Sequence, residues 1–100
     1  MAPQLPIDRV IALRYNHTMK AVRYSAEAIA NLKRYGNMAR RVRKAINEYA
    51  ADPTAHANNV TRLVGSPASR MRVADYRVIF VETEQELVVT RIGPRGNVYD

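Results

Sequence analysis

The sequence contains no cysteine and no tryptophan, and only two of its 100 residues are histidine, His17 and His56. The absence of cysteine excludes disulfide bonds, thiolate nucleophiles and zinc sites with cysteine ligands. Two histidines far apart in the sequence do not form the pattern of a histidine metal site, so we expect neither a metal nor another cofactor. Any chemistry must then use arginine, lysine, tyrosine or carboxylate side chains.

Long apolar segments are also missing, because no run approaches the roughly 20 apolar residues of a membrane span. The opening residues, MAPQLPIDR, lack the basic stretch followed by an apolar stretch that marks a secretory signal. We therefore expect a cytoplasmic protein without a membrane partner. With 47% hydrophobic and 25% charged residues, a chain of this length suffices for one globular domain.

Acidic residues are scarce in the first half of the chain. Residues 1–50 carry ten lysines and arginines against three acids, whereas residues 51–100 carry six arginines against six acids. The net charge of +7 therefore comes from the first half. Such a charge favours a polyanionic partner, either nucleic acid or an acidic protein, although a surface that is merely soluble and basic has the same composition.

The recognisable pattern begins at Met19. Residues 1–18 carry two prolines and contain no complete element, so we interpret them as an extension or as a misassigned start. A strand is expected over residues 21–24, and residues 19–100 are expected to form the domain.

Two helices should follow the first strand as a helical hairpin. Ser25 suits the N-cap of the first helix, and Gly36 is expected to end it. Asn37 is expected to cap the second helix, which should end before Pro53 because the residue ahead of a proline disfavours helical angles. Apolar residues recur at spacings of three and four in both segments, as amphipathic helices require.

One face of the second helix carries four cations, Arg40, Arg41, Arg43 and Lys44. The first two lie in the opening turn, where the helix dipole disfavours a cation by about 0.3–1 kcal/mol each. We interpret this face as an RNA-binding or partner-binding surface; the alternative is a solvated basic helix face. The following segment, residues 52–67, has turn composition and is expected to be a connector in which His56 is a surface residue.

The last third of the chain is expected to form an antiparallel meander. Residues 69–73, 76–81 and 87–92 are rich in β-branched and aromatic residues, and short polar segments separate them. Residues 93–96 contain two glycines and a proline, which favours a turn over a strand. With the first strand, the sequence predicts an α+β fold in which a helical hairpin packs on a four-stranded, mainly antiparallel sheet.

Arginines recur inside these strands at alternate positions. Arg70 and Arg72 alternate with Met71 and Val73, so the apolar pair can enter a core while both guanidinium groups project from the other face. Arg77 follows in the next strand, Arg95 in the turn and Tyr99 near the end of the chain. These three residues and Arg70 are candidates to converge at one site.

These segments resemble the RelE branch of the RelE/ParE superfamily of bacterial type II toxins. The resemblance covers residues 19–100 and depends most on RMRVADYRVIF and on the closing RIGPRGNVYD. Ala74 stands where glycine is common in the family. The resemblance implies a fold like that of microbial ribonucleases, cleavage of mRNA on the ribosome and silencing by a cognate antitoxin. It also implies that the toxin–antitoxin complex binds its own promoter through the antitoxin.

Carried over residue by residue, the resemblance assigns the catalytic site to Arg70, Arg77, Arg95 and Tyr99. Arg72, which projects from the same face as Arg70, is expected to bind RNA. A second strand lysine of the family falls on Ala68 here. Planar guanidinium groups suit a phosphate that gathers negative charge during attack by the RNA 2′-OH. Tyr99 is then the candidate acid or base.

Other interpretations of these residues stay open. Each arginine can instead form a structural ion pair with Asp75, Glu82 or Asp100, and Tyr99 can instead pack in the core or stack on a base. Two other functions also remain: a ParE-like toxin that inhibits DNA gyrase without nuclease activity, and an RNA-binding module without toxicity.

Overall fold

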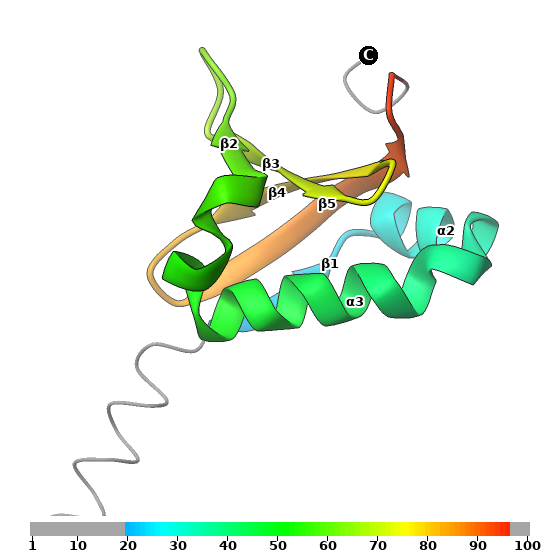
Figure 1. Ribbon diagram of the computed structural model, residues 1–100, viewed down its shortest axis with the longest axis horizontal. Helices are drawn as coiled ribbons and strands as arrows, with labels where there is room; N and C mark the ends of the chain where they lie inside the picture. The colour runs from blue at the N-terminus through cyan, green and yellow to red at the C-terminus, as the bar shows by residue number, and fades with distance from the viewer. Residues whose placement is uncertain (1–19, 97–100) are drawn as a thin grey trace, which may run out of the picture.

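The computed structural model describes residues 20–96, which form a five-stranded sheet with two helices on one of its faces (Figure 1). The elements in chain order are β1 (Ala21–Tyr24), α2 (Ala26–Arg34), α3 (Gly36–Ala51), the short 3₁₀ helix η1 (Pro53–Asn59), β2 (Val60–Arg62), β3 (Ala68–Val73), β4 (Tyr76–Glu82) and β5 (Glu86–Pro94). The strand order is β1-β5-β4-β3-β2. The pair of β1 and β5 is parallel, and the three other pairs are antiparallel.

The α+β class and the mainly antiparallel sheet are confirmed, but the predicted number of strands is wrong. Val60–Arg62, expected to belong to a connector, pairs with β3 and adds a fifth strand at the edge of the sheet. The two strands form a hairpin, and at the base of its loop the N–H of Leu63 donates a hydrogen bond to the carbonyl of Ala68 at 3.0 Å. Gly65 adopts a φ of +74° at its tip, a conformation that glycine adopts without strain.

The boundary between the two helices also differs from the prediction. Tyr35 alone joins them, with φ −107° and ψ 48°, and its N–H donates to the carbonyl of Asn31. Gly36 is the first residue of α3 and does not end α2 in a left-handed conformation. Asn37 lies inside α3, which begins without a side-chain cap. The break therefore depends on the backbone angles of Tyr35.

Ser25 caps α2 as predicted. Its Oγ accepts a hydrogen bond from the N–H of Ala28 at 3.0 Å and donates one to the carbonyl of Thr90 at 2.9 Å. Thr90 is the extra residue of a β-bulge, because the pairing of β4 with β5 passes from Ile79–Arg91 to Phe80–Val89. The cap therefore also joins α2 to β5.

The core lies between the helices and one face of the sheet. The helices contribute buried residues such as Val42 and Ile46, and the strands contribute Phe80, Leu87 and Val89, all fully buried. Burial of a side chain of this size contributes about 1.5–3 kcal/mol, so these contacts hold the helices on the sheet. The opposite face of the sheet, called the open face below, carries a second, smaller apolar cluster formed by Leu63, Ala68, Ile79 and Val81.

The strand β5 continues through Gly93 and Pro94, which were expected to form a turn. The N–H of Ile92 points away from β4, toward Asn31, so the nitrogen of Pro94 two residues later points the same way. A proline at this position costs the ladder no hydrogen bond, which explains why the strand tolerates it. No helix among residues 20–96 is long and apolar enough to cross a membrane.

Candidate functional site

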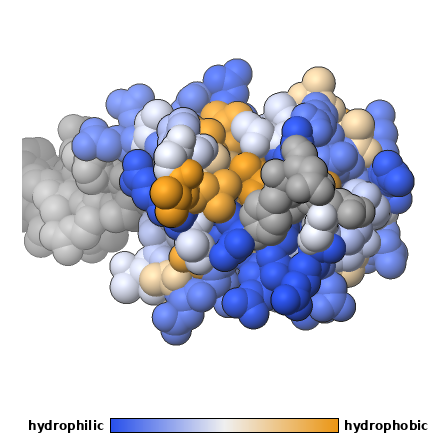
Figure 2. Space-filling model, turned by 90° about the horizontal axis from the view of Figure 1, so that it is seen from above, coloured by the Kyte–Doolittle hydropathy of each residue, from blue (hydrophilic) through white to orange (hydrophobic). Residues whose placement is uncertain are grey.

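The arginines of β3 lie on the open face of the sheet. Met71 and Val73 are buried against the helices, so the alternation of the strand directs Arg70 and Arg72 to the other side. Ala68 lies on the same face as these arginines and is buried in the smaller apolar cluster. Figure 2, which views the molecule from above, shows an apolar area edged by hydrophilic side chains.

Arg77 joins this group from the neighbouring strand. It lies directly opposite Arg72 in the register of β3 and β4, and opposite Gly93 in the register of β4 and β5. Arg95 follows the end of β5, and its N–H donates to the carbonyl of Asp75 at 2.9 Å. The structure thus brings Arg70, Arg72, Arg77 and Arg95 together, and we call them the arginine cluster.

A strained turn sets the position of Asp75. Ala74 has a φ of 54°, in the left-handed region that a residue with a Cβ adopts only at a cost of about 1–2 kcal/mol. This turn joins β3 to β4 and thereby determines which arginines face each other. The glycine expected at this position from the family pattern would adopt the same angles without that cost.

The other three arginines of the cluster act electrostatically on Arg77. Burial lowers the pKa of Arg77, the positive charges of Arg95, Arg72 and Arg70 lower it further, and Asp75 opposes them. Among residues 20–96, no carboxylate oxygen lies within 4.0 Å of the guanidinium nitrogens of Arg72, Arg77 or Arg95. The expected alternative of an ion pair with Asp75 or Glu82 is therefore not what holds these three side chains.

Like charges directly opposite each other destabilise a sheet by a few tenths to about 1 kcal/mol. Arg72 and Arg77 form such a pair, and Arg70 and Arg95 add to the repulsion. A bound anion would relieve it. Guanidinium groups bind phosphate oxygens in bidentate fashion, so the arrangement suits a phosphate. Within the described residues there is no group of three or more His, Cys, Asp or Glu side chains that could hold a metal ion.

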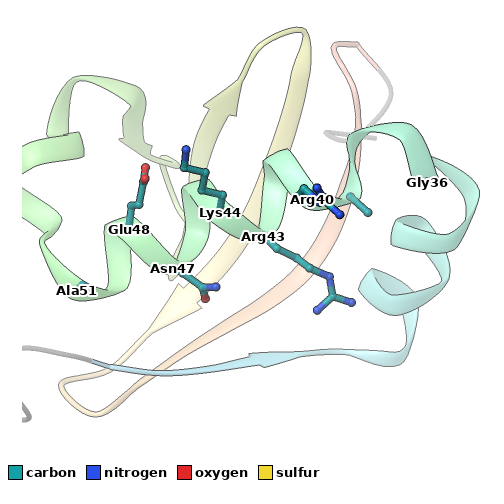
Figure 3. Close-up of a pocket in the computed structure, with 8 residues that line it drawn as sticks. Gly36, Arg40, Arg43, Lys44, Asn47, Glu48 and Ala51 are labelled. Carbon is teal, nitrogen blue, oxygen red and sulfur yellow. The ribbon is translucent and has the colours of Figure 1, made fainter.

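The cations of α3 form a separate basic surface. Arg40, Arg43 and Lys44 line a shallow groove on the outer side of the helix, together with Asn47 and Glu48 (Figure 3). Arg43 is held over the ring of Tyr24 in β1, with its guanidinium carbon 5.3 Å from the ring centroid. Arg41 is exposed on the same helix. The core lies between this helix and the sheet, so α3 and the arginine cluster occupy opposite sides of the molecule.

The remaining candidates lie elsewhere. Tyr99 lies outside the described residues, as do Asp100 and residues 1–18. His56 lies in η1, where its Nε2 is 3.7 Å from Glu48 Oε1 of α3, and it does not belong to the arginine cluster. The structure therefore places four of the five predicted residues of the sheet site and leaves the acid or base unassigned.

A polar pocket between α2 and β5 was not predicted from the sequence. Asn31, Arg34 and Tyr35 of the helical segment face Ile92 and Gly93 across it. In the sequence, Asn31 is only a polar position of an amphipathic helix, and Arg34 is only one of several cations. No local signal distinguished them, because the pocket forms where two distant segments meet.

Among the comparisons with known proteins, the one with solved structures identifies the fold. No family model matches the sequence, and no curated protein matches it. Among solved structures, RelE in the RelE–RelB complex from Pyrococcus horikoshii OT3 has a TM-score of 0.65 and 21% sequence identity, with 79% of this chain and 98% of that chain covered.

Two bacterial complexes are also similar. The toxin–antitoxin complex RelBE2 from Mycobacterium tuberculosis has a TM-score of 0.60 at 18% identity, with 77% of this chain and 99% of that chain covered. The DinJ–YafQ toxin–antitoxin complex from E. coli has a TM-score of 0.57 at 15% identity, with 82% and 99% covered. The resemblance inferred from residues 19–100 is thereby confirmed for the fold: this chain has the α+β fold of the RelE toxins.

Proposed function

We propose that this chain is the toxin of a type II toxin–antitoxin pair and that it is an endoribonuclease cleaving mRNA on the ribosome. The observation that carries the proposal is the arginine cluster on the open face of the sheet, centred on Arg77. The similar structures support the first part, since they include toxin–antitoxin complexes. A cognate antitoxin is the proposed partner, in addition to mRNA and the ribosome.

In the proposed reaction, the 2′-oxygen of a ribose attacks the adjacent phosphorus. A bond forms between these two atoms while the bond from phosphorus to the 5′-oxygen of the next nucleotide breaks. The 2′-hydroxyl gives up its proton to a base, and the leaving 5′-oxygen takes one from an acid. Negative charge gathers on the non-bridging phosphoryl oxygens, and Arg77 and Arg95 are the groups proposed to stabilise it.

The other arginines have supporting roles in this proposal. Arg70 is a further catalytic residue of the proposed site, and Arg72 binds a neighbouring phosphate of the RNA, since both project from β3 beside Arg77. Tyr99 is the proposed acid or base. His56 lies beside Glu48, outside the arginine cluster, and position 68 is an alanine. Positioning of the mRNA by the ribosome therefore supplies part of the rate in this proposal.

The basic surface of α3 has a separate proposed role. This surface would contact the phosphate backbone of ribosomal RNA through Arg40, Arg41, Arg43 and Lys44. While the toxin is bound to its antitoxin, an acidic segment of the antitoxin would cover basic surface on this chain. Complementary charge speeds such capture. The arginine cluster, with Tyr99 following Arg95 near the end of the chain, supports a nuclease over an inhibitor of DNA gyrase.

Expression of the gene, with mapping of mRNA cleavage and of plasmid supercoiling, tests the proposal. Arg77→Ala and Arg95→Ala should each lower the cleavage rate about 10²- to 10³-fold. Arg23→Ala is the matched control, because this exposed arginine lies on β1 and pairs with Glu86 at 3.0 Å. Altered supercoiling without mRNA cleavage would contradict the nuclease proposal and favour inhibition of DNA gyrase.

Two substitutions of Tyr99 separate its hydroxyl from its ring. If the phenol is the acid or base, Tyr99→Phe should already lose about 10²-fold or more in cleavage rate on programmed ribosomes. If the ring only stacks on a base, Tyr99→Phe should cleave normally, and Tyr99→Ala should lose about 1–3 kcal/mol of binding. Normal cleavage by Tyr99→Phe would remove the phenol from the mechanism.

A further inference from the structure

A polar pocket of about 310 Å³ lies where α2 meets the outer edge of β5. The strand β1 pairs only with Glu86–Val89, so the rest of β5 has no strand on that side. The helix α2 lies beside this open edge instead (Figure 1). Pockets that bind small ligands begin at about 300 Å³, so the space is large enough for one planar group.

The walls of the pocket offer both donors and acceptors of hydrogen bonds. Asn31 Oδ1 accepts a hydrogen bond from the N–H of Ile92 at 2.8 Å, which leaves the amide NH₂ of Asn31 to donate. The carbonyl of Ile92 points to the same side of the strand as its N–H and is available to accept. One donor and one acceptor thus lie next to each other at the strand edge.

A flat cationic group stands beside this pair. The guanidinium carbon of Arg34 lies 5.4 Å from the centroid of the Tyr35 ring, and no carboxylate among the described residues pairs with Arg34. The Tyr35 ring is itself held edge-on by Tyr76, with 5.2 Å between centroids. Guanidinium planes and aromatic rings are the surfaces on which proteins stack unpaired bases of RNA.

The pocket and the arginine cluster share the same end of β5. Gly93, which lines the pocket, lies opposite Arg77 in the sheet, and Arg95 follows two residues later. An RNA strand with one phosphate on Arg77 therefore has a neighbouring nucleotide within reach of the pocket.

We infer that this pocket is a nucleobase subsite, in which Asn31 and Ile92 read the edge of one unpaired base and Arg34 stacks on it. The inference rests on the proposed function and concerns the substrate preference of the same site. A base fits better than a phosphate or an acidic peptide, because the pocket also holds the carboxylate of Glu27, paired with Arg91 at 3.0 Å. A neutral group with both donors and acceptors matches this mixture.

Binding of non-cleavable RNA tests the inference without catalysis. The full chain is titrated into four labelled 2′-O-methyl hexanucleotides, each made of a single base, and affinities are read from fluorescence anisotropy. The informative variant is Asn31→Asp, which keeps an acceptor for the N–H of Ile92 and removes the NH₂ donor. We expect the unaltered chain to prefer one base, and we expect Asn31→Asp to lower that preference about 3- to 10-fold.

Arg34→Gln has a matched control in Lys33→Gln. Both variants remove one positive charge from neighbouring exposed positions of α2, but Lys33 does not line the pocket. Arg34→Gln should weaken binding of the preferred hexanucleotide more than Lys33→Gln does, by about 3-fold or more.

The results of these binding experiments decide whether the pocket binds a base. If the unaltered chain binds RNA and loses affinity on Arg77→Gln, but binds the four bases equally or keeps its preference in Asn31→Asp, the pocket is not a base subsite and the proposed function stands. If the unaltered chain binds none of the four hexanucleotides, the subsite fails, and mapping of mRNA cleavage on ribosomes decides the proposed function separately. An Arg34→Gln variant that matches Lys33→Gln would exclude stacking on Arg34.

Discussion

Arg77 occupies an electrostatically unfavourable position in the folded chain. It is half-buried, faces Arg72 across the sheet and is surrounded by the charges of Arg95 and Arg70. Only Asp75 opposes them, and no described carboxylate approaches within 4.0 Å. Strain of this kind is concentrated at binding and catalytic sites in proteins, which is consistent with the proposed role of Arg77.

The repulsion at Arg77 predicts the effect of its removal on stability. Arg77→Gln should leave the free energy of unfolding unchanged or raise it by a few tenths to about 1 kcal/mol, because it relieves a like-charge cross-strand pair. Urea denaturation at low salt measures the difference. Arg91→Gln is the control, since Arg91 contacts Glu27 at 3.0 Å, and its loss should lower stability. A clear loss of stability in Arg77→Gln would mean that the side chain is structural.

At the scale of elements, Gly36 shows where the local pattern misled. Its φ is not positive, and an added Cβ would have no atom within 4 Å, so nothing in the structure requires glycine at the start of α3. Gly36→Ala should therefore stabilise the chain by about 0.5–1 kcal/mol through the higher helix propensity of alanine.

Gly65 provides the matched control for this substitution. An added Cβ at Gly65 also meets open space, but its φ of +74° strains any residue with a side chain. Gly65→Ala should destabilise by about 1 kcal/mol in the same denaturation experiment. Equal effects of the two substitutions would show that φ does not decide between them.

The contact between α3 and β4 depends on a buried tyrosine. Tyr49 donates from its hydroxyl to both carboxylate oxygens of Glu82, at 2.7 and 3.2 Å, and Lys20 approaches Glu82 Oε2 at 3.0 Å. Burial raises the pKa of Tyr49, and the hydrogen bond and charge of Glu82 raise it further. The hydroxyl therefore stays protonated at pH values where a free tyrosine has ionised.

This shift predicts a loss of stability in alkali. An unfolded tyrosine releases its proton near pH 10, whereas folded Tyr49 keeps it, so the stability from Tyr49 is complete below about pH 10 and falls as the pH rises above it. Tyr49→Phe should cost about 1.5–3 kcal/mol at pH 8, with a smaller difference at pH 11. Denaturation at both pH values tests this, and a constant difference would contradict it.

At the scale of the whole molecule, the two basic surfaces lie on different sides of the sheet. The arginine cluster occupies the open face, and α3 carries Arg40, Arg43 and Lys44 on its outer side (Figure 3). The core between them prevents one short oligonucleotide from contacting both. Binding of a short RNA should therefore involve only one of the two surfaces.

Salt dependence measures how many charges take part. If the four arginines each neutralise one phosphate, the logarithm of the RNA affinity should fall with the logarithm of salt concentration with a slope of about −3. Arg72→Gln should reduce that slope by about 0.7, and Lys44→Gln should leave it unchanged for a hexanucleotide. If Lys44→Gln reduced the slope instead, the RNA would bind to the basic surface of α3 and not to the arginine cluster.

The amino-acid sequence by itself determined what depends on local periodicity and capping. The alternation of Arg70 and Arg72 with Met71 and Val73 was enough to predict which side chains enter the core, and Ser25 was enough to locate the start of α2. These features depend on neighbours within a few residues, so no tertiary information was needed.

Only the tertiary structure decided which distant groups meet. Arg77 faces Arg72 because the turn at Ala74 sets the register of β3 and β4, and Arg95 is held there by the carbonyl of Asp75. The pocket at Asn31 exists because β1 ends at Tyr24 and leaves the outer edge of β5 to the helix α2. Register and strand length are set by pairing between segments far apart in the chain, and such pairing leaves no signal in the local sequence.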